Sequence, residues 1–301
     1  MTAEDLRKSI LQQAIQGKLV PQDPKDEPAS ALLARIREEK ERLVTEKKIK
    51  RDKNESIIYR GEDNSYYEKF LATGEVKCID EEISFEIPQS WEWTRMGAIG
   101  DWGSGSTPSR GNPYYYGGDI PWLKTGELND GIVYNTEEKI TEKALKECSL
   151  RLNSTGDVLI AMYGATIGKV AIAGTPMTTN QACCGCTPIF VNNEYLFYFL
   201  LASKSDFIKK SEGGAQPNIS REKLISHLMP IAPLNEQCKI IRALKNILVH
   251  VDKYKKTQIT LSELNSRIIE QLKRSVLQYA IQGKLVPQNP NDPSAIQLLE
   301  Q

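Results

Sequence analysis

The chain has 301 residues, with 39 Lys and Arg balanced by 39 Asp and Glu, and its formal net charge is zero. This length suits one large domain or two smaller ones, and the charge balance by itself indicates neither a nucleic-acid nor a membrane partner. The sequence has no apolar run of the roughly 18–20 residues that a membrane span needs, and no secretory signal pattern. Its six cysteines have no regular spacing. We therefore expect a soluble cytoplasmic protein with reduced thiols and no membrane partner.

The first 50 residues are predicted to form an N-terminal helical segment. Apolar residues between positions 5 and 20 follow a helical spacing that ends at Gly17, before Pro21. After a proline-rich joint, Ser30 is expected to cap a second helix that runs to Lys50. The alternating charges of this second helix are typical of a solvated face.

Residues 51–234 change in character and predict a globular domain that mixes helices and strands. Three short β-like runs, at 157–163, 169–173 and 187–191, are separated by glycine-rich turns. One helical stretch, 194–210, lies among them. The order does not follow a regular βαβ series, so we expect an α+β domain.

Residues 235–301 are predicted to begin with one long helix. From Glu236 to Gln282 there is neither glycine nor proline, and an unbroken helix of that length would reach about 70 Å. Its apolar seam is interrupted by Gln258 and Asn265, and such a stripe needs a partner helix. The predicted seam consists of Ile247, Val251, Tyr254, Leu261, Ile268 and Leu272. The alternative is a helix that breaks between residues 255 and 260 and packs on its own domain.

The end of the chain repeats its beginning. Residues 6–24 and 272–290 are identical at fourteen of nineteen positions, and the copies lie 266 residues apart. This period is far longer than the roughly 20–50 residues of solenoid repeats. The pattern indicates one domain-sized unit followed by the opening segment of another, and hence a protein that acts in pairs.

Two motifs superficially suggest catalysis. Asn112-Pro113-Tyr114-Tyr115 is similar to the N-P-P-Y/F signature of amino-methyltransferases, but it lacks the second proline and a nearby glycine-rich cofactor loop. The segment 164–170 is similar to a phosphate loop with one residue too few and valine in place of Ser/Thr. We interpret the first as a turn that carries aromatic residues and the second as a tight turn between two strands.

The thiol cluster Cys183, Cys184 and Cys186 does not predict a metal site. Neighbouring cysteines on a strand face opposite sides, and both histidines are distant in sequence. A buried strand is the better interpretation. Because no Ser/His/Asp or Cys/His set stands out either, we expect no catalytic site, no metal and no cofactor.

Five segments, in order, resemble landmarks of the specificity (S) subunits of type I restriction–modification systems. They are residues 103–124, 157–169, 179–182, 213–220 and 230–237. The resemblance covers nearly the whole chain once the long helix and the repeated AIQGKLVP are included. It implies an α+β fold, in which a mixed α/β target-recognition domain is joined to a long α-helix that forms an antiparallel coiled coil with a partner helix.

The resemblance also implies a non-catalytic function. Such a subunit reads a split sequence in double-stranded DNA and docks methyltransferase subunits, which restriction subunits join. This chain contains one recognition domain and stops where a second half would begin, so we expect a half-subunit or a fragment. Two half-chains paired through their long helices would form a two-fold homodimer that reads a symmetric split site.

Charge argues against strong DNA binding by the chain alone. Between residues 85 and 230 there are 13 Lys and Arg against 15 Asp and Glu, so partner subunits are expected to contact most phosphates. The candidate DNA-binding residues lie in or beside turns and are Arg110, Tyr114, Tyr115, Tyr116, Lys124, Thr125, Tyr163, Lys169, Gln216, Asn218 and Arg221. In the structural alternative, the aromatic residues are core, and the polar residues at 180–181 and 216–218 satisfy backbone groups.

Two other functions remain open from the sequence. The first is a recognition domain that belongs to a methyltransferase enzyme. The second is a helical adaptor whose globular domain binds protein rather than DNA.

Overall fold

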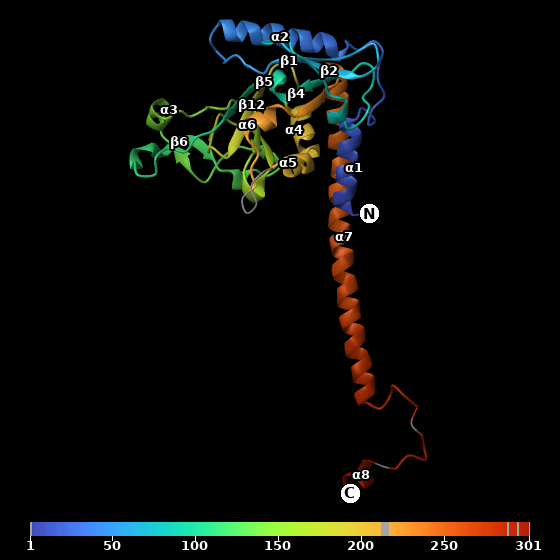
Figure 1. Ribbon diagram of the computed structural model, residues 1–301. Helices are drawn as coiled ribbons and strands as arrows, with labels where there is room; N and C mark the ends of the chain where they lie inside the picture. Colours follow the sequence, from blue (N-terminus) through green and yellow to red (C-terminus); the bar gives the residue numbers. More distant parts are fainter. Residues whose placement is uncertain (1, 212–216, 288, 294, 301) are drawn as a thin grey trace. The chain divides into compact units, whose positions relative to one another are not determined.

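The described strands of the globular part form four small β-sheets. Figure 1 shows this part beside the start of the long helix α7 (Leu234–Ile281). The computed structural model describes residues 2–211, 217–287, 289–293 and 295–300. Packing divides the chain into two units, Arg7–Ile247 and a second unit of Met1–Leu6 with Leu248–Gln301. The described strands lie in the first unit.

The elements alternate without a regular repeat. The helices are α1 (Ala3–Ile15), α2 (Ala29–Thr45), α3 (Glu142–Glu147), α4 (Asn193–Ala202), α5 (Lys204–Lys210), α6 (Arg221–Ile225), α7 (Leu234–Ile281) and α8 (Ala295–Leu299). The strands are β1 (Ser56–Arg60), β2 (Tyr66–Phe70), β3 (Val76–Cys78), β4 (Glu92–Arg95), β5 (Gly100–Ser104), β6 (Tyr116–Leu123), β7 (Gly131–Val133), β8 (Lys139–Ile140), β9 (Val158–Ala161), β10 (Val170–Ala173), β11 (Thr178–Thr179), β12 (Cys183–Pro188) and β13 (Leu228–Ile231). Five 3-10 turns join them: η1 (Asp80–Glu82), η2 (Met96–Ile99), η3 (Pro113–Tyr115), η4 (Thr125–Glu127) and η5 (Gly164–Thr166).

The largest sheet has the strand order β5-β12-β9-β10-β7, and β5 is one of its edges. Strands β9 and β10 pair antiparallel and are apolar at every position, which confirms the first two predicted strands. Helix α4 packs against both of them and buries five aromatic or leucine side chains. This buried, two-sided sheet explains why the runs are continuously apolar rather than alternating.

Two predicted elements in this unit have different bounds in the structure. The third predicted strand, at 187–191, is wrong: β12 ends at Pro188, and Phe190 adopts a left-handed φ of 56° that no strand tolerates. The predicted helix 194–210 is two helices, α4 and α5, separated at Ser203. Phe207 of α5 is fully buried.

Of the two N-terminal helices, the first ends just before Gly17 as predicted, and the second is shorter than predicted. Helix α1 ends at Ile15, and Gly17 has the left-handed φ of 69° expected after a helix. Ser30 is not the cap of α2, because Pro28 occupies that position and the Ala29 amide donates to the Ser90 carbonyl. Helix α2 ends at Thr45 rather than at residue 50, since Lys47 adopts a φ of 58°.

Helix α7 is one continuous element of 48 residues (Figure 1). The alternative of a break between residues 255 and 260 is therefore wrong. In the second unit, the Ala3 amide donates to the Gln258 side chain at 3.3 Å, and Glu4 lies 3.7 Å from Lys255.

The members of the predicted seam fall into two groups. Val251 is buried and Ile247 is half-buried within the chain, whereas the remaining four are exposed: Tyr254, Leu261, Ile268 and Leu272. The seam thus stays uncovered over the C-terminal part of α7 in this single chain.

Candidate nucleic-acid interface

Three segments that carry predicted DNA-binding residues lie side by side with residues 180–182 in the globular unit. The Asn180 amide donates to the Leu123 carbonyl, and the Met162 amide donates to the Ala182 carbonyl. Residues 162–164 also bond to a third segment: the Gly164 amide donates to the Pro217 carbonyl, and the Ile219 amide donates to the Met162 carbonyl. We call residues 123–125, 180–182, 162–164 and 217–219 the loop edge.

The loop edge presents an aromatic ring and an amide together. Tyr163 and Asn218 form an isolated antiparallel bridge, and both are exposed, Tyr163 by 42%. Lys124 and Thr125 lie half-buried after β6, and Lys169 is half-buried where β10 begins. A ring face with nearby amide and hydroxyl groups can stack on a base or sugar and bind base edges. Gln216, also predicted here, lies outside the described residues.

Two predicted DNA-binding cations are held by one carboxylate. Arg110 pairs through both terminal nitrogens with Glu138, and Lys124 lies 3.0 Å from the same carboxylate. The guanidinium also lies over the rings of Tyr116, at 4.6 Å, and Trp122, at 5.0 Å. Hydrogen bonds from Arg110 and then Lys124 lower the pKa of Glu138 to about 2. Both cations are therefore paired within the chain, and the Lys124 ammonium also lies 3.3 Å from the Glu137 carboxylate.

The three consecutive tyrosines differ in environment. Tyr116 donates its hydroxyl to the Pro108 carbonyl and packs edge-on against buried Trp122, which is a structural role. Tyr115 donates to Glu147 at 3.0 Å. Tyr114 is 73% exposed, with Lys143 5.4 Å from its ring, so of the three it presents the most surface to a ligand. Asn112 caps η3, and this confirms a turn that carries aromatic residues.

Segment 103–107 is bonded to residues 179–182 and so supports one segment of the loop edge. The Ser106 amide donates to the Thr179 carbonyl, and the Thr107 hydroxyl bonds to the Gln181 side chain. A Cβ on Gly105 would lie 2.2 Å from the Thr179 carbonyl and hydroxyl oxygens. Gln181 thus bonds to a side chain rather than to backbone. The buried side-chain oxygen of Asn180 (Oδ1) has no partner among the described residues.

Arg221 lies at a different place, a basic cleft that the sequence did not reveal. Its guanidinium donates twice to the Trp102 carbonyl of β5. The cleft has a volume of about 670 Å³, and three carboxylates and seven cations line it. The cations are Lys40, Lys48, Lys50, Arg51, Lys53, Arg151 and Arg221. Five of them lie between residues 40 and 53, a stretch that sequence reasoning treated as the end of a solvated helix, so only the concentration of lysines there could have pointed to the cleft.

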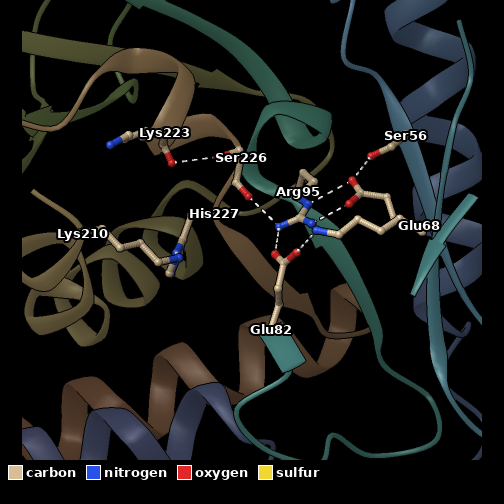
Figure 2. Close-up of polar contacts among 9 residues, drawn as sticks. Ser56, Glu68, Glu82, Arg95, Lys210, Lys223, Ser226 and His227 are labelled. Atoms are coloured by element: carbon tan, nitrogen blue, oxygen red, sulfur yellow. Dashed lines mark hydrogen bonds and ion pairs between the residues drawn. The ribbon is translucent and has the colours of Figure 1, made fainter. Parts of the chain in front are cut away.

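A network of charged side chains joins the β1-β2-β3 sheet to the rest of this unit (Figure 2). Figure 2 shows Arg95 of β4 between Glu68 of β2 and Glu82 of η1, with a further hydrogen bond to the Ser226 carbonyl. The hydrogen bond from Arg95 lowers the pKa of Glu82. Glu68 and Arg95 are largely buried, so the network is structural rather than a ligand site.

Features associated with catalysis serve structural roles. Segment 164–170 is a turn between the antiparallel strands β9 and β10, as predicted. Cys183, Cys184 and Cys186 are buried in β12, and burial raises the pKa of the Cys184 thiol to about 12. The described part of the chain brings no three His, Cys, Asp or Glu residues together as metal ligands. Its helices include none that is long and apolar enough to cross a bilayer.

Comparison with known proteins identifies the family. Residues 88–263, which include most of the globular unit and its loop edge, match the family described as the type I restriction modification DNA specificity domain. The chain belongs to this family. The match therefore confirms the resemblance seen in the sequence motifs.

Relatives extend beyond the region that this chain matches. The MjaIX specificity subunit of Methanocaldococcus jannaschii is 39% identical over 165 residues, which are 53% of this chain and 38% of the relative. The EcoAI specificity subunit of Escherichia coli is 27% identical over 345 aligned positions, covering 98% of this chain and 54% of the relative. The chain thus spans about half the length of these relatives or less.

Solved structures share the fold. The HsdS subunit from Thermoanaerobacter tengcongensis superimposes with a TM-score of 0.50 at 22% identity, over 67% of this chain and 47% of that chain. A chain from a study of complex assembly and conformational transition of the type I R-M system superimposes with a TM-score of 0.52 at 21% identity, over 67% and 48%. The predicted α+β fold with a long helix is confirmed.

Proposed function

We propose that this chain is a non-catalytic specificity subunit that reads one half of a bipartite site in double-stranded DNA. The family match over residues 88–263 carries this proposal, because it covers the described loop edge. The reading head would be the loop edge, with Tyr163 and Asn218 at its centre.

The predicted DNA-binding residues take different parts in this proposal. Exposed Tyr114, Tyr163 and Asn218, with Thr125, would contact bases or sugars. Arg110 would reach DNA by exchanging Glu138 for a phosphate or a guanine edge, and Lys124 by exchanging both Glu137 and Glu138. Tyr116 and Tyr115 would support this surface. Lys169, Arg221 and Gln216 stay predicted contacts.

The long helix would supply the pairing surface. Over its C-terminal part α7 leaves large apolar side chains exposed, among them Leu261 and Leu272 at 57% and 63%. An apolar stripe of this length favours a partner helix. We propose that two chains pair there as a two-fold homodimer in the cytoplasm. Methyltransferase subunits would dock on the helices, and restriction subunits would join through them.

Selection from random DNA duplexes tests the proposal. The chain would be reconstituted with its methyltransferase subunit, and bound duplexes would be sequenced over successive rounds. We expect an enriched motif of two symmetric halves at a fixed separation, because two identical heads are held by two rigid helices. Absence of any enrichment would favour a protein-binding adaptor. Heat on titration with S-adenosylmethionine in calorimetry of the isolated chain would favour a methyltransferase.

Single substitutions assign the reading residues. Asn218→Ala is expected to relax the enriched motif at one position, since a base contact discriminates by about 1–3 kcal/mol. Tyr163→Ala should weaken binding to all DNA sequences alike, because the stacking of its ring on a base is lost whatever the base is. Tyr134→Ala is the matched control, because Tyr134 is an exposed tyrosine outside the loop edge. If the control changes the motif as much as Asn218→Ala does, the loop edge is not the reading head.

A further inference from the structure

The basic cleft combines cations from segments distant in sequence. One wall is the stretch between residues 48 and 54 that follows α2, and the other walls are β5 and the start of α6. The cleft lies within the unit Arg7–Ile247. No described loop-edge residue lines it, and of its lining residues the proposed function names only Arg221, as a predicted contact.

Strand β5 adds backbone donors to this cleft. It is an edge strand that pairs on one side only, antiparallel to β12. Antiparallel pairing turns the backbone groups of alternate residues away from the partner strand. Trp102 is one of these residues, because its carbonyl accepts from Arg221 instead of β12. The amides of Gly100, Trp102 and Ser104 therefore lie on the open edge, and all three residues line the cleft.

Part of the positive charge is available to a ligand. Lys40 is buried and donates to the Gly97 carbonyl at 2.9 Å, and Arg151 is paired with Asp101, so both shape the wall. Lys50 and Lys53 are exposed and have no ion-pair partner in the part of the chain that the structure describes. These ammonium groups on flexible stems line the same cleft as the open-edge amides of β5, and such a combination is typical of an oxyanion site.

We infer that the basic cleft binds the phosphodiester backbone of nucleic acid. The inference rests on the proposed function, because it assigns the phosphate contacts that a DNA-reading chain needs. Residues 85–230 carry more acidic than basic side chains, yet seven of the ten charged residues that line the cleft are basic. Several cations spaced along one stretch match a polymer with one charge per repeat better than a small anion, which needs donors that converge on a point.

The test compares two double variants of the full chain. Lys50→Gln with Lys53→Gln removes two cations from the cleft. Lys25→Gln with Lys69→Gln removes two exposed lysines elsewhere and is the matched control. Binding of a fluorescent random-sequence duplex of about 30 base pairs is followed by anisotropy between about 20 and 200 mM salt. Circular dichroism verifies that both variants are folded, as expected for exposed positions.

We expect the cleft variant to bind at least about tenfold more weakly at about 50 mM salt, and its salt slope to fall by about two. The control should keep the affinity and slope of the unchanged chain. Equal behaviour of the two variants would overturn the inference, as would absence of binding by the unchanged chain at the lowest salt. Loss of methyltransferase association with unchanged DNA binding would overturn it in favour of an acidic protein surface.

The same variants separate this inference from the proposed function. If the reconstituted complex enriches no motif but the cleft variant still loses duplex affinity, sequence reading fails and the phosphate cleft stands. If the motif is enriched and the cleft variant binds like the control, the cleft inference fails and sequence reading stands.

Discussion

Glu138 decides whether two predicted DNA-binding cations can act. It pairs with both Arg110 and Lys124, and its pKa of about 2 keeps it ionised at every pH above about 3. Mild acid therefore cannot release the cations. Phosphate oxygens must compete with a carboxylate that is already in place.

Replacing Glu138 by glutamine should strengthen DNA binding. Glu138→Gln removes one negative charge and breaks the ion pairs of this side chain with Arg110 and Lys124. We therefore expect severalfold tighter duplex binding at low salt and a steeper salt slope. Anisotropy titrations measure both. Glu75→Gln removes one exposed carboxylate elsewhere, and its effect should be clearly smaller. Equal effects would mean that net charge alone matters.

His227 should make stability depend on pH. Burial first, then Lys210 and Arg95, lowers its pKa to about 3, and Figure 2 shows Lys210 directed at its ring, 2.9 Å away. The folded chain keeps His227 neutral, whereas the unfolded chain binds a proton below about pH 6.5. Stability is therefore lost as pH falls from about 6.5 towards 3.

The His227 contribution is measurable by urea unfolding. As the pH falls from about 6.5 to about 5, protonation of His227 in the unfolded chain should lower the free energy of unfolding by about 2 kcal/mol. His227→Gln should abolish this part of the pH dependence. His250→Gln, at an exposed position of α7, should leave it unchanged. An unchanged pH dependence in His227→Gln would contradict the assignment.

Gly105 tests whether segment 103–107 is structural. Gly105→Ala should destabilise the fold by about 1–3 kcal/mol, because its Cβ would overlap the Thr179 backbone and hydroxyl. Gly126→Ala, where a Cβ meets nothing within 4 Å, is the control. Thermal melts compare the two. A Gly105→Ala variant as stable as the control would show that the two segments can separate.

At the scale of elements, α7 shows how one continuous helix exposes a surface. Its sequence lacks glycine and proline, and it remains helical for 48 residues. Exposed large apolar side chains on a helix are commonly an interaction site. The pairing surface is therefore expected along its C-terminal part rather than at Val251, which is buried.

Charging this surface should separate paired chains. Ile268→Lys with Leu272→Lys places two charges on the exposed seam, so sedimentation should show a monomer where the unchanged chain is a dimer. Gln271→Lys with Ser266→Lys adds the same charge outside the seam and should leave the dimer intact. A monomeric unchanged chain would contradict homodimerisation through α7.

At the scale of the whole molecule, zero net charge limits DNA affinity. Thirty-nine basic and thirty-nine acidic residues leave no long-range attraction to a polyanion, and any attraction must come from local clusters such as the basic cleft. Binding by clusters falls steeply with salt.

The isolated chain should therefore bind DNA weakly and in a salt-sensitive manner. We expect micromolar or weaker binding at physiological salt, and a marked gain when methyltransferase subunits are added. Anisotropy with and without the partner measures this. Nanomolar binding by the chain alone at physiological salt would contradict the division of phosphate contacts between subunits.

Local chemistry made much of the fold predictable. The glycine at position 17, the apolar runs of β9 and β10 and the unbroken α7 depend on neighbours within a few residues, and all three agree with the structure. The β1-β2-β3 sheet was not predicted, because its strands carry charges at exposed positions and bury few side chains. The predicted ends of one helix and one strand were wrong, because Lys47 and Phe190 adopt left-handed backbone angles that the sequence does not indicate.

The repeated segment separates what sequence determines from what packing decides. Leu11, Ala14 and Ile15 are buried in the first copy, whereas the matching residues of the second copy are exposed. Identical residues thus acquire different roles, because burial depends on what surrounds them. For the same reason, sequence located the family motifs and the long helix, but only tertiary structure paired Arg110 with Glu138 and gathered the basic cleft, since charges distant in sequence interact at distances that packing sets.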